Sequence, residues 1–234
     1  QSDLNQAMYG RNGECPAVVI AAQSASDCFD TAFEACKIAL EFMLPVILLS
    51  DGYIANGSEP WSLPDLDKLP KIKTKIIKKA TDEKFSPYKR DEKTLARDWA
   101  LPGTPGLEHR IGGLEKAAVS GNVSYDADNH DYMVKLRQQK IDVIADFIPE
   151  LEVYGNPKGE LLILSWGGTY GACRAAVEKA NKNKISVSHI NLKYINPFPK
   201  NLGEILLKFN KVLIPEINLG QLSTIIRSKF LIDT

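Results

Sequence analysis

The sequence has no excess of charge of either sign and no long apolar run. Lysine and arginine together number 29, as do aspartate and glutamate, so the formal net charge at pH 7 is zero. Such a chain creates no long-range field that favours nucleic acid or an anionic membrane surface. No apolar stretch approaches the roughly 20 residues that cross a bilayer, and the first residues form no signal peptide. We therefore expect a cytoplasmic protein with no nucleic-acid or membrane partner.

Cysteine and histidine are scarce as well. The four cysteines are Cys15, Cys28, Cys36 and Cys173. No two have the C-x-x-C spacing of a zinc or iron–sulfur site, and three lie in apolar or helical patterns, where a free thiol behaves as a small buried hydrophobe. The three histidines, His109, His130 and His189, lie on different predicted elements. We therefore predict that this chain provides no metal ligands and no histidine-based triad.

The first part of the chain has the pattern of a strand, a helix and a second strand. Short apolar runs at 17–22 and 45–50 predict buried strands. Ser24 or Ser26 can cap the helix between them, and a proline ends it. The apolar face expected for this helix is Phe29, Ala32, Phe33, Cys36, Leu40 and Met43. The short connection makes the strands parallel, and two strands are too few for a sheet, so the rest must precede Gln1 or come from elsewhere.

Residues 57–157 form a segment that is rich in proline and glycine. Its apolar side chains are too many for a flexible spacer. They include Trp61, Trp99, Leu107 and Ile111. We expect this linker to be an ordered excursion that rests on the C-terminal unit or on a second polypeptide. Its lysine-rich run at 71–79 suits a solvated strand edge better than a phosphate-binding edge, and a helix is expected at 128–147.

Residues 158–234 alternate between strand and helix patterns. Strands are expected at 159–166, 185–195 and 210–217, and helices at 169–183, 202–209 and 220–230. This alternation is the signature of an α/β unit with a parallel sheet.

The first of these strands passes into its helix through a glycine turn, "SWGGTYGA", which contains Gly167 and Gly168. Such a turn can bind a phosphate, because free N–H groups and the helix dipole attract an anion. The pattern departs from G-x-G-x-x-G, has no P-loop lysine and has no acidic residue at the end of the next strand. We therefore interpret it as a tight strand-to-helix turn, with Trp166 and Tyr170 beside it as packing residues.

Several ordered blocks of the sequence resemble one family. The C-terminal blocks resemble the C-terminal domain of 2-oxoacid:ferredoxin oxidoreductase alpha subunits, in the order "LLILSWGGTYGACRAAVE", "INLKYINPFPKNLGEIL" and "KVLIPEINLGQL". The end of the family's pyrimidine-binding domain resembles "QSDLNQAMYGRNGE" and "PVILLSDGYIANGSEPW", and its connecting segment resembles "WALPGTPGLEHRIGGLE" and "DNHDYMVKLRQQKI". The resemblance implies an α/β fold in three parts. These are the remnant of a pyrimidine-binding thiamine-diphosphate domain (1–56), a long irregular linker with one helix (57–157), and a three-layer α/β domain like the transketolase C-terminal domain, truncated at its end (158–234).

The resemblance also implies an activity. The family oxidatively decarboxylates a 2-oxoacid with coenzyme A and gives an acyl-CoA, carbon dioxide and reduced ferredoxin. Relatives for 2-oxoglutarate are among the members that it resembles, and we favour this substrate. Thiamine diphosphate with Mg²⁺ supplies the carbanion chemistry. A beta subunit carries the diphosphate-binding domain and an iron–sulfur cluster.

The expected catalytic residues precede Gln1 in this family. They include the glutamate that contacts the pyrimidine ring of the cofactor. We therefore expect the chain to be a piece of a longer polypeptide, to bind no cofactor by itself and to be inactive alone.

Three residues are candidates for the substrate or CoA side. Arg11, in the loop "YGRNGE", can pair with a carboxylate or a CoA phosphate through its planar guanidinium, or it is an exposed loop charge. Asn12 stands where relatives often have histidine, which argues against acid–base chemistry there. Asp51 follows a parallel strand, where the sites of α/β proteins gather, or it bonds the turn after it, which we favour.

Two other functions fit the same patterns. The chain could be the equivalent part of a 2-oxoacid dehydrogenase or a transketolase relative, although those proteins have short linkers in place of "WALPGTPGLEHRIGGLE". It could also be a non-catalytic assembly module.

The isolated chain should not bind thiamine diphosphate with useful affinity, because the pyrimidine-contacting glutamate and the diphosphate domain are expected on other segments. Titration calorimetry with the cofactor and Mg²⁺ is expected to show no saturable heat. A micromolar dissociation constant, about −8 kcal/mol in binding free energy, would contradict this expectation.

Overall fold

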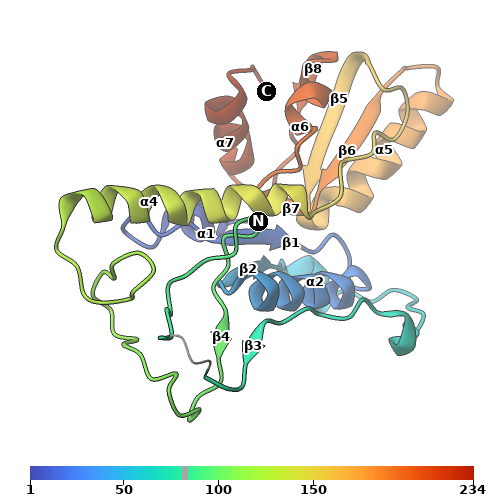
Figure 1. Ribbon diagram of the computed structural model, residues 1–234. Coiled ribbons are helices and arrows are strands. Elements are labelled where there is room, and N and C mark those ends of the chain that lie inside the picture. Colours follow the sequence, from blue (N-terminus) through green and yellow to red (C-terminus); the bar gives the residue numbers. More distant parts are fainter. Residues whose placement is uncertain (81–83) are drawn as a thin grey trace.

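A computed structural model describes residues 1–80 and 84–234 and contains two α/β units joined by an irregular segment (Figure 1). The helices are α1 (Leu4–Tyr9), α2 (Asp27–Phe42), α3 (Gly52–Asn56), α4 (Ala127–Asp142), α5 (Tyr170–Lys182), α6 (Leu202–Leu206) and α7 (Gln221–Phe230), and the short 3₁₀ helices are η1 (Leu66–Lys68), η2 (Val143–Asp146) and η3 (Gly167–Thr169). The strands are β1 (Val18–Ala21), β2 (Val46–Leu49), β3 (Ile76–Ile77), β4 (Trp99–Ala100), β5 (Gly159–Trp166), β6 (Ser188–Leu192), β7 (Tyr194–Asn196) and β8 (Phe209–Leu213). Within these described ranges, no helix is both long and apolar enough to cross a membrane.

The strand–helix–strand unit predicted near the start of the chain is confirmed. β1 and β2 are parallel, with Val18 beside Val46 and Ala21 beside Leu49. α2 connects them and ends at Met43, which has a left-handed backbone with φ of 51°. A left-handed residue is a common way for a helix to end, because it turns the chain sharply away from the helix axis.

The apolar face predicted for α2 is wrong. The helix buries Thr31, Ile38 and Phe42, whereas Cys36 and Leu40 are exposed. α2 carries apolar residues on two faces, and the sheet covers only the face that contains Ile38 and Phe42. The Cys36 thiol is therefore not the buried small hydrophobe that we expected.

The irregular segment packs against the second apolar face of α2. The Trp99 indole Nε1 donates to the Leu40 carbonyl at 2.9 Å, and the Trp61 ring lies 5.7 Å from the Phe29 ring. Both tryptophans therefore contact the first α/β unit, whereas we expected support from the C-terminal unit or from a second polypeptide. Further along this segment, Leu107 is buried.

The lysine-rich run at 71–79 is a solvated strand edge, as predicted. It contains β3, which pairs in parallel with β4, and most of its side chains are exposed. Ile76 is 44% exposed and Ile111 is 81% exposed, so this part of the segment leaves apolar surface open to solvent.

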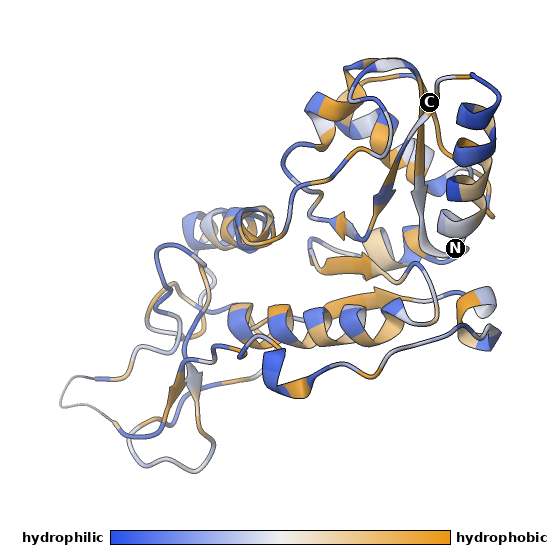
Figure 2. Ribbon diagram, turned by 90° about the vertical axis from the view of Figure 1, so that its right-hand side faces the viewer, coloured by the Kyte–Doolittle hydropathy of each residue, from blue (hydrophilic) through white to orange (hydrophobic). Residues whose placement is uncertain are grey.

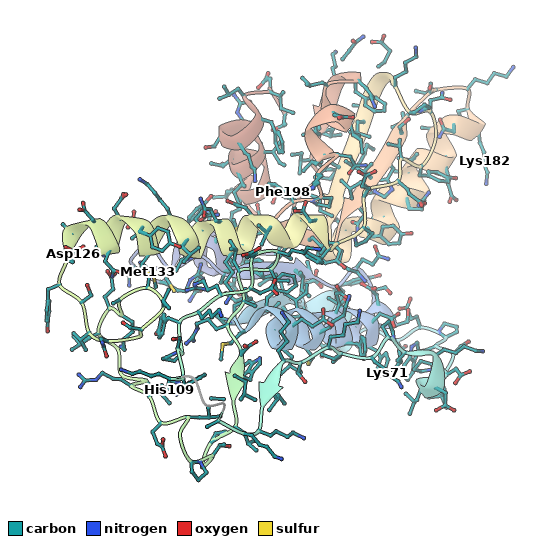
Figure 3. The ribbon with its side chains drawn as sticks, viewed as in Figure 1. Lys71, His109, Asp126, Met133, Lys182 and Phe198 are labelled. Atoms are coloured by element: carbon teal, nitrogen blue, oxygen red, sulfur yellow. The ribbon has the colours of Figure 1, made fainter. Side chains whose placement is uncertain are left out.

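α4 is the helix predicted at 128–147, and it crosses the junction of the two units (Figure 1). It begins where the Asp126 carboxylate accepts a hydrogen bond from the Asn129 N–H at 2.7 Å, and Figure 3 labels Asp126 at this end of the helix. The buried residues of α4 are Met133, Leu136, Lys140 and Ile141.

Lys140 ties α4 to the end of α2. Its ammonium donates to the Met43 carbonyl at 2.8 Å, and the side chain is almost fully buried. Burial, together with the positive charges of Arg90 and Arg97, lowers the pKa of Lys140 to about 7.

The prediction of one strand at 185–195 is wrong in one respect, because the structure has two strands there and they belong to different sheets. β6 pairs in parallel with β5, whose other edge pairs in parallel with β8. β7 follows after the single residue Lys193 and pairs antiparallel with β1 of the first unit. The Lys193 carbonyl accepts from the Ala21 N–H at 2.8 Å, so the crossing point is itself hydrogen-bonded.

β1 contributes to two hydrophobic cores. Val19 and Ala21 face a core that includes Trp166 of the C-terminal unit. Val18 and Ile20 face a second core, built with α2 and α4. All four β1 side chains are at most 1% exposed, and Figure 2 shows this strand among the most apolar elements of the interior. The two α/β units are therefore packed on opposite faces of one strand.

Candidate functional site

A wide groove lies at the carboxyl ends of β1 and β2 in one sheet and of β5 and β8 in the other. Its volume is about 960 Å³. Its lining comes from the segments that follow these four strands, within 23–25, 53–59, 168–172 and 215–217. Ligands of α/β proteins bind at the carboxyl ends of strands, so this groove is the candidate site.

The glycine turn beside the groove holds an anion that belongs to the chain itself. The Gly168 N–H donates to one carboxylate oxygen of Asp51 at 2.9 Å, and the other oxygen accepts from the Ile54 N–H at 2.9 Å. Asp51 therefore bonds the turn that follows it, as we favoured, and it also joins α3 to the glycine turn. The Gly168 N–H is therefore not free to donate a hydrogen bond to a bound phosphate.

Backbone geometry explains why this turn needs glycine. Gly167 has a left-handed φ of 57°, which side chains with a Cβ rarely adopt. At Gly168 a Cβ atom would lie 2.3 Å from the Asp51 carboxylate, so the close approach is possible only without a side chain. Trp166 is buried as expected for a packing residue.

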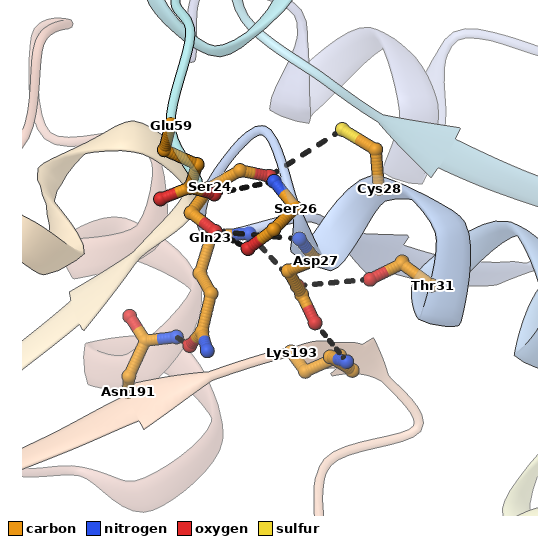
Figure 4. Close-up of polar contacts among 9 residues, drawn as sticks. All are labelled: Gln23, Ser24, Ser26, Asp27, Cys28, Thr31, Glu59, Asn191 and Lys193. Atoms are coloured by element: carbon orange, nitrogen blue, oxygen red, sulfur yellow. Dashed lines mark hydrogen bonds and ion pairs between the residues drawn. The ribbon is translucent and has the colours of Figure 1, made fainter. Parts of the chain in front are cut away.

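Asp27 is the first residue of α2 and follows the groove-lining residues Gln23, Ser24 and Ala25 (Figure 4). Its N–H donates to the Ser24 hydroxyl at 3.3 Å, and its carboxylate accepts from the Gln23 N–H at 3.0 Å. The same carboxylate accepts from the Thr31 hydroxyl at 2.9 Å and from the Lys193 ammonium at 2.6 Å. Asp27 therefore connects α2 to the crossing point between β6 and β7.

Glu59 reaches the same helix start from the irregular segment. Its carboxylate accepts a hydrogen bond from the Ser26 N–H (Figure 4). Hydrogen bonds from Ser24 and Ser26 lower the pKa of this exposed carboxyl group.

Glu216 performs the equivalent role at α7. Its carboxylate accepts from the N–H groups of Leu222 at 2.9 Å and Ser223 at 3.1 Å, and from the Trp166 indole at 3.2 Å. The pattern S-x-x-D identifies the pair of Ser24 and Asp27 in the sequence. Neither Glu59 nor Glu216 has a comparable local signal, and our sequence reasoning missed all three.

A buried polar chain runs from the groove into the C-terminal sheet. The Gln23 amide oxygen accepts from Asn191 at 2.8 Å, and the Asn191 amide oxygen accepts from the Ser165 hydroxyl at 2.7 Å. Because Ser165 has one hydroxyl hydrogen, the His189 Nε2, 2.7 Å from this oxygen, must be the donor. A serine that gives its proton to an amide is not an activated nucleophile, so this pair is no catalytic dyad.

His189 is neutral in this chain of hydrogen bonds. It is 1% exposed, and burial lowers its pKa to about 4, with the positive charge of Arg174 acting in the same direction. The other two histidines lie on separate elements, where His109 contacts the Leu107 carbonyl and His130 contacts Glu115.

The structure does not bring the three predicted site residues together. The Arg11 guanidinium donates to the carbonyl groups of Met8 and Cys15, at 2.9 and 2.7 Å, and to a third carbonyl of α1. Asn12 is exposed and has a left-handed φ of 54°, which asparagine tolerates. Both precede β1, whereas Asp51 follows β2. Because β1 and β2 are parallel, these positions lie at opposite ends of the sheet.

The residues of the groove do not fit a diphosphate with Mg²⁺. No lysine, arginine or histidine lines it. Among residues 1–80 and 84–234, no group of three His, Cys, Asp or Glu side chains is placed to hold a metal ion. The N–H group of Gly168 and the N–H groups at the start of α2 already have partners within the chain.

The chain is an α/β protein with a groove at the strand ends, and comparison with known families narrows this class. Residues 1–128, more than half of the chain, match a family model described as "Pyruvate flavodoxin/ferredoxin oxidoreductase, thiamine diP-bdg". The chain belongs to this pyruvate flavodoxin/ferredoxin oxidoreductase family.

Individual relatives agree with this assignment. The chain is 55% identical over its full length to "2-oxoglutarate oxidoreductase subunit KorA" of Mycobacterium tuberculosis, and the match covers 35% of that protein. It is 27% identical, over 97% of its length, to "2-oxoacid:ferredoxin oxidoreductase 1, subunit alpha" of Aeropyrum pernix, and this match covers 36% of the relative. The resemblance to these alpha subunits is therefore confirmed, and the chain spans about a third of their length.

A solved structure has the same fold. It is the 2-oxoglutarate:ferredoxin oxidoreductase of Magnetococcus marinus with 2-oxoglutarate, coenzyme A and succinyl-CoA bound. The TM-score is 0.88 at 29% identity, over 98% of this chain and 40% of that one. The match extends through both α/β units and the segment between them.

Replacing Gly168 by alanine should destabilise the protein by about 1–3 kcal/mol, because the added methyl group collides with the Asp51 carboxylate. Gly171→Ala is the matched control, since a Cβ there meets nothing within 4 Å and alanine favours the helix. Urea unfolding measures both variants. In an Asp51→Ala background the Gly168→Ala cost should shrink, and an unchanged cost would exclude the proposed contact.

Stability should fall more steeply with acid in the wild type than in His189→Gln. The folded pKa of about 4 lies below the ordinary value of 6.5, so between these values the unfolded chain binds the proton and the folded chain does not. From pH 7 to pH 5 this difference amounts to about 2 kcal/mol of lost stability. His130→Gln is the control, and equal pH slopes for the wild type and His189→Gln would contradict the prediction.

Proposed function

We propose that this chain is part of the alpha subunit of a cytoplasmic enzyme that oxidatively decarboxylates a 2-oxoacid, with 2-oxoglutarate favoured. Coenzyme A accepts the acyl group, carbon dioxide leaves, and two electrons pass to ferredoxin. The observation that carries this proposal is the 55% identity along the full chain to a 2-oxoglutarate oxidoreductase subunit. The relative of known structure, which binds 2-oxoglutarate and coenzyme A, supports the same substrates.

The cofactor would be shared with a second subunit. Thiamine diphosphate stabilises the carbanion formed when the 2-oxoacid loses carbon dioxide. No lysine, arginine or histidine lines the groove of this chain, and no cluster of three His, Cys, Asp or Glu side chains is placed to hold a metal ion among residues 1–80 and 84–234. This supports placing the diphosphate, Mg²⁺ and an iron–sulfur cluster on a beta subunit. The names of the relatives, which call them subunits, support a complex of several chains.

Arg11 is proposed as a contact for a carboxylate of the substrate or a phosphate of coenzyme A. A guanidinium has five N–H donors, and the three carbonyl groups that Arg11 contacts leave donors for a ligand. These carbonyl contacts hold the planar group in one orientation at the end of α1. Asn12 and Asp51 stay secondary candidates, and Asp51 already has two N–H partners.

A non-catalytic assembly role is the second candidate function. One observation favours it, namely that the carboxylates around the groove bind backbone groups of the chain itself. In that case the groove would organise the fold and would leave the reaction to the partner subunit.

The complex that contains this chain should reduce ferredoxin only when both a 2-oxoacid and coenzyme A are present. Acyl-CoA formation would be followed by mass spectrometry with 2-oxoglutarate and pyruvate in parallel. A higher kcat/KM for ferredoxin reduction with 2-oxoglutarate than with pyruvate would support 2-oxoglutarate as the substrate. A complex with correct subunits and cofactor that turns over neither acid would exclude the proposal.

Arg11→Lys should raise the KM for 2-oxoglutarate or for coenzyme A about tenfold or more in this complex, because a lysine cannot replace two parallel donors. The exposed Arg110→Lys serves as the control. A purely structural Arg11 would instead lower the melting temperature and leave both KM values unchanged.

The irregular segment should gain protection when the partner subunit binds. Its exposed apolar residues, such as Ile111, favour a protein contact there. Hydrogen exchange would compare the chain alone with the complex. Amides of residues 95–115 should gain more protection than those of 169–183, and equal values in both states would exclude a partner-binding role.

A further inference from the structure

Positive side chains gather where α4 meets the irregular segment and the end of α2. Arg90 and Arg97 face each other in an antiparallel bridge of the irregular segment, and the charges of both act on Lys140 of α4. Arg137 adds a further positive charge near Arg90 and lies 3.9 Å from the Glu115 carboxylate. Within the part of the chain that the structure describes, the other three cations form no ion pair. The cluster therefore has an excess of positive charge at a place where burial strengthens repulsion.

The hydrogen bonds of this cluster go to neutral acceptors. Each of the three cations donates to a backbone carbonyl group, namely Arg90 to Leu95 at 2.9 Å, Arg97 to Pro87 at 3.2 Å and Lys140 to Met43 at 2.8 Å. The Nε of Arg90 is buried and has no hydrogen-bond partner among the described residues. A buried donor without an acceptor is costly, so the interior of the cluster lacks an acceptor, and a negatively charged one would also relieve the repulsion.

Lys140 is the member of the cluster that can lose its proton near neutral pH. Burial, with the charges of Arg90 and Arg97, lowers its pKa to about 7, whereas the arginines stay protonated. At pH 7.5 more than half of Lys140 is then the neutral amine, while a lysine with the ordinary pKa of 10.5 is only about 0.1% neutral. A neutral amine has a free electron pair and is a nucleophile.

We propose that Lys140 is a carbamylation site, at which the side-chain amine binds carbon dioxide covalently among the guanidinium groups of Arg90 and Arg97. The electron pair of the neutral nitrogen attacks the carbon atom, an N–C bond forms, and one C=O π bond becomes the C–O⁻ of the carbamate. The nitrogen releases one proton to water, so the amine and carbon dioxide give –NH–COO⁻ and H⁺. One N–H stays on the nitrogen and keeps a donor for the Met43 carbonyl.

The carbamate reverses the charge in the middle of the cluster. It has two oxygen acceptors, as a carboxylate has, and guanidinium groups bind such a group with strong charge-assisted hydrogen bonds. Repulsion between Lys140 and the two arginines is thereby replaced by attraction. The reagent follows from burial, since Lys140 is 8% exposed, which suits a small uncharged molecule and excludes a bulky acyl donor. The modification does not depend on the proposed function, because dissolved carbon dioxide is its only reagent.

Labelling of the full chain with ¹³C-bicarbonate, which equilibrates with carbon dioxide, tests this site. At pH 7.5 the carbamate would be trapped as an ester with triethyloxonium ion and located by peptide mass spectrometry. The peptide with Lys140 should carry at least ten times more label than the peptide with Lys135, an exposed lysine of the same helix that pairs with Asp131. Unfolding the wild type in urea before trapping should remove the label, because the pKa of Lys140 then returns to its ordinary value. Equal labelling of both lysines, no label on Lys140, or a label that survives unfolding would overturn the proposal.

Variants separate covalent addition from the binding of a free anion. Lys140→Arg keeps the positive charge and forms no carbamate, so the ¹³C NMR signal of the carbamate should be absent from it. Arg90→Gln should lower the label on Lys140 at least fivefold, and the exposed Arg110→Gln should leave it unchanged, with circular dichroism confirming that each variant is folded. If bicarbonate raised the melting temperature of the wild type and of Lys140→Arg equally and left no trapped label, the cluster would bind free bicarbonate and the proposal would be overturned. None of these measurements uses the activity of the complex, so their outcome leaves the proposed function untouched.

Discussion

Strand β1 connects the two halves of the molecule, because its alternate side chains point to opposite faces of the sheet and all of them are buried. Val19 and Ala21 complete the core of the C-terminal unit, and Val18 and Ile20 complete the core beneath α2 and α4. A polar or larger residue at any of these positions would disturb one core or the other. The groove depends on this arrangement, since the two sets of strand ends meet only where the cores share β1.

Carboxylates also join the elements around the groove. Asp51 links the two units at the glycine turn, and Asp27 links α2 to Lys193 at the crossing between the sheets. At the glycine turn, the Asp51 carboxylate takes the Gly168 N–H that an anion would otherwise bind. A motif that usually indicates a phosphate therefore serves here to bind the chain to itself. The difference depends on one carboxylate, which comes from 117 residues earlier in the sequence.

Local patterns were enough to predict much of the fold. The β1–α2–β2 unit, β5, α5 and α7 follow from apolar periodicity and from proline and glycine positions. The predictions failed where the answer depends on distant residues. α2 has two apolar faces, and only tertiary packing determines that Ile38 and not Leu40 is buried. The strand at 185–195 divides because its second half finds β1, which no local pattern reveals.

The site was less predictable than the fold, for the same reason. Asp51 was identified because it follows a parallel strand, and its hydrogen bond to the next turn was expected. Its bond to Gly168 was not, since it joins residues from different units. Glu59 and Glu216 act on helices that begin elsewhere in the chain, so no local spacing indicates them. Arg11 was singled out for its chemistry, and its position at the other end of the sheet follows only from the topology.

The passage of the chain from β6 to β7 across one residue has a consequence for how the polypeptide can be divided. A cut in the loop between Asn156 and Lys158 would divide the chain between the two units along the sequence, yet β7 would leave with the C-terminal piece. The N-terminal piece would then have β1 as an edge strand, with its backbone donors and acceptors unpaired on one side. Such an edge invites pairing with another copy and aggregation. The two pieces are therefore better regarded as complementary fragments than as two domains that can be produced separately.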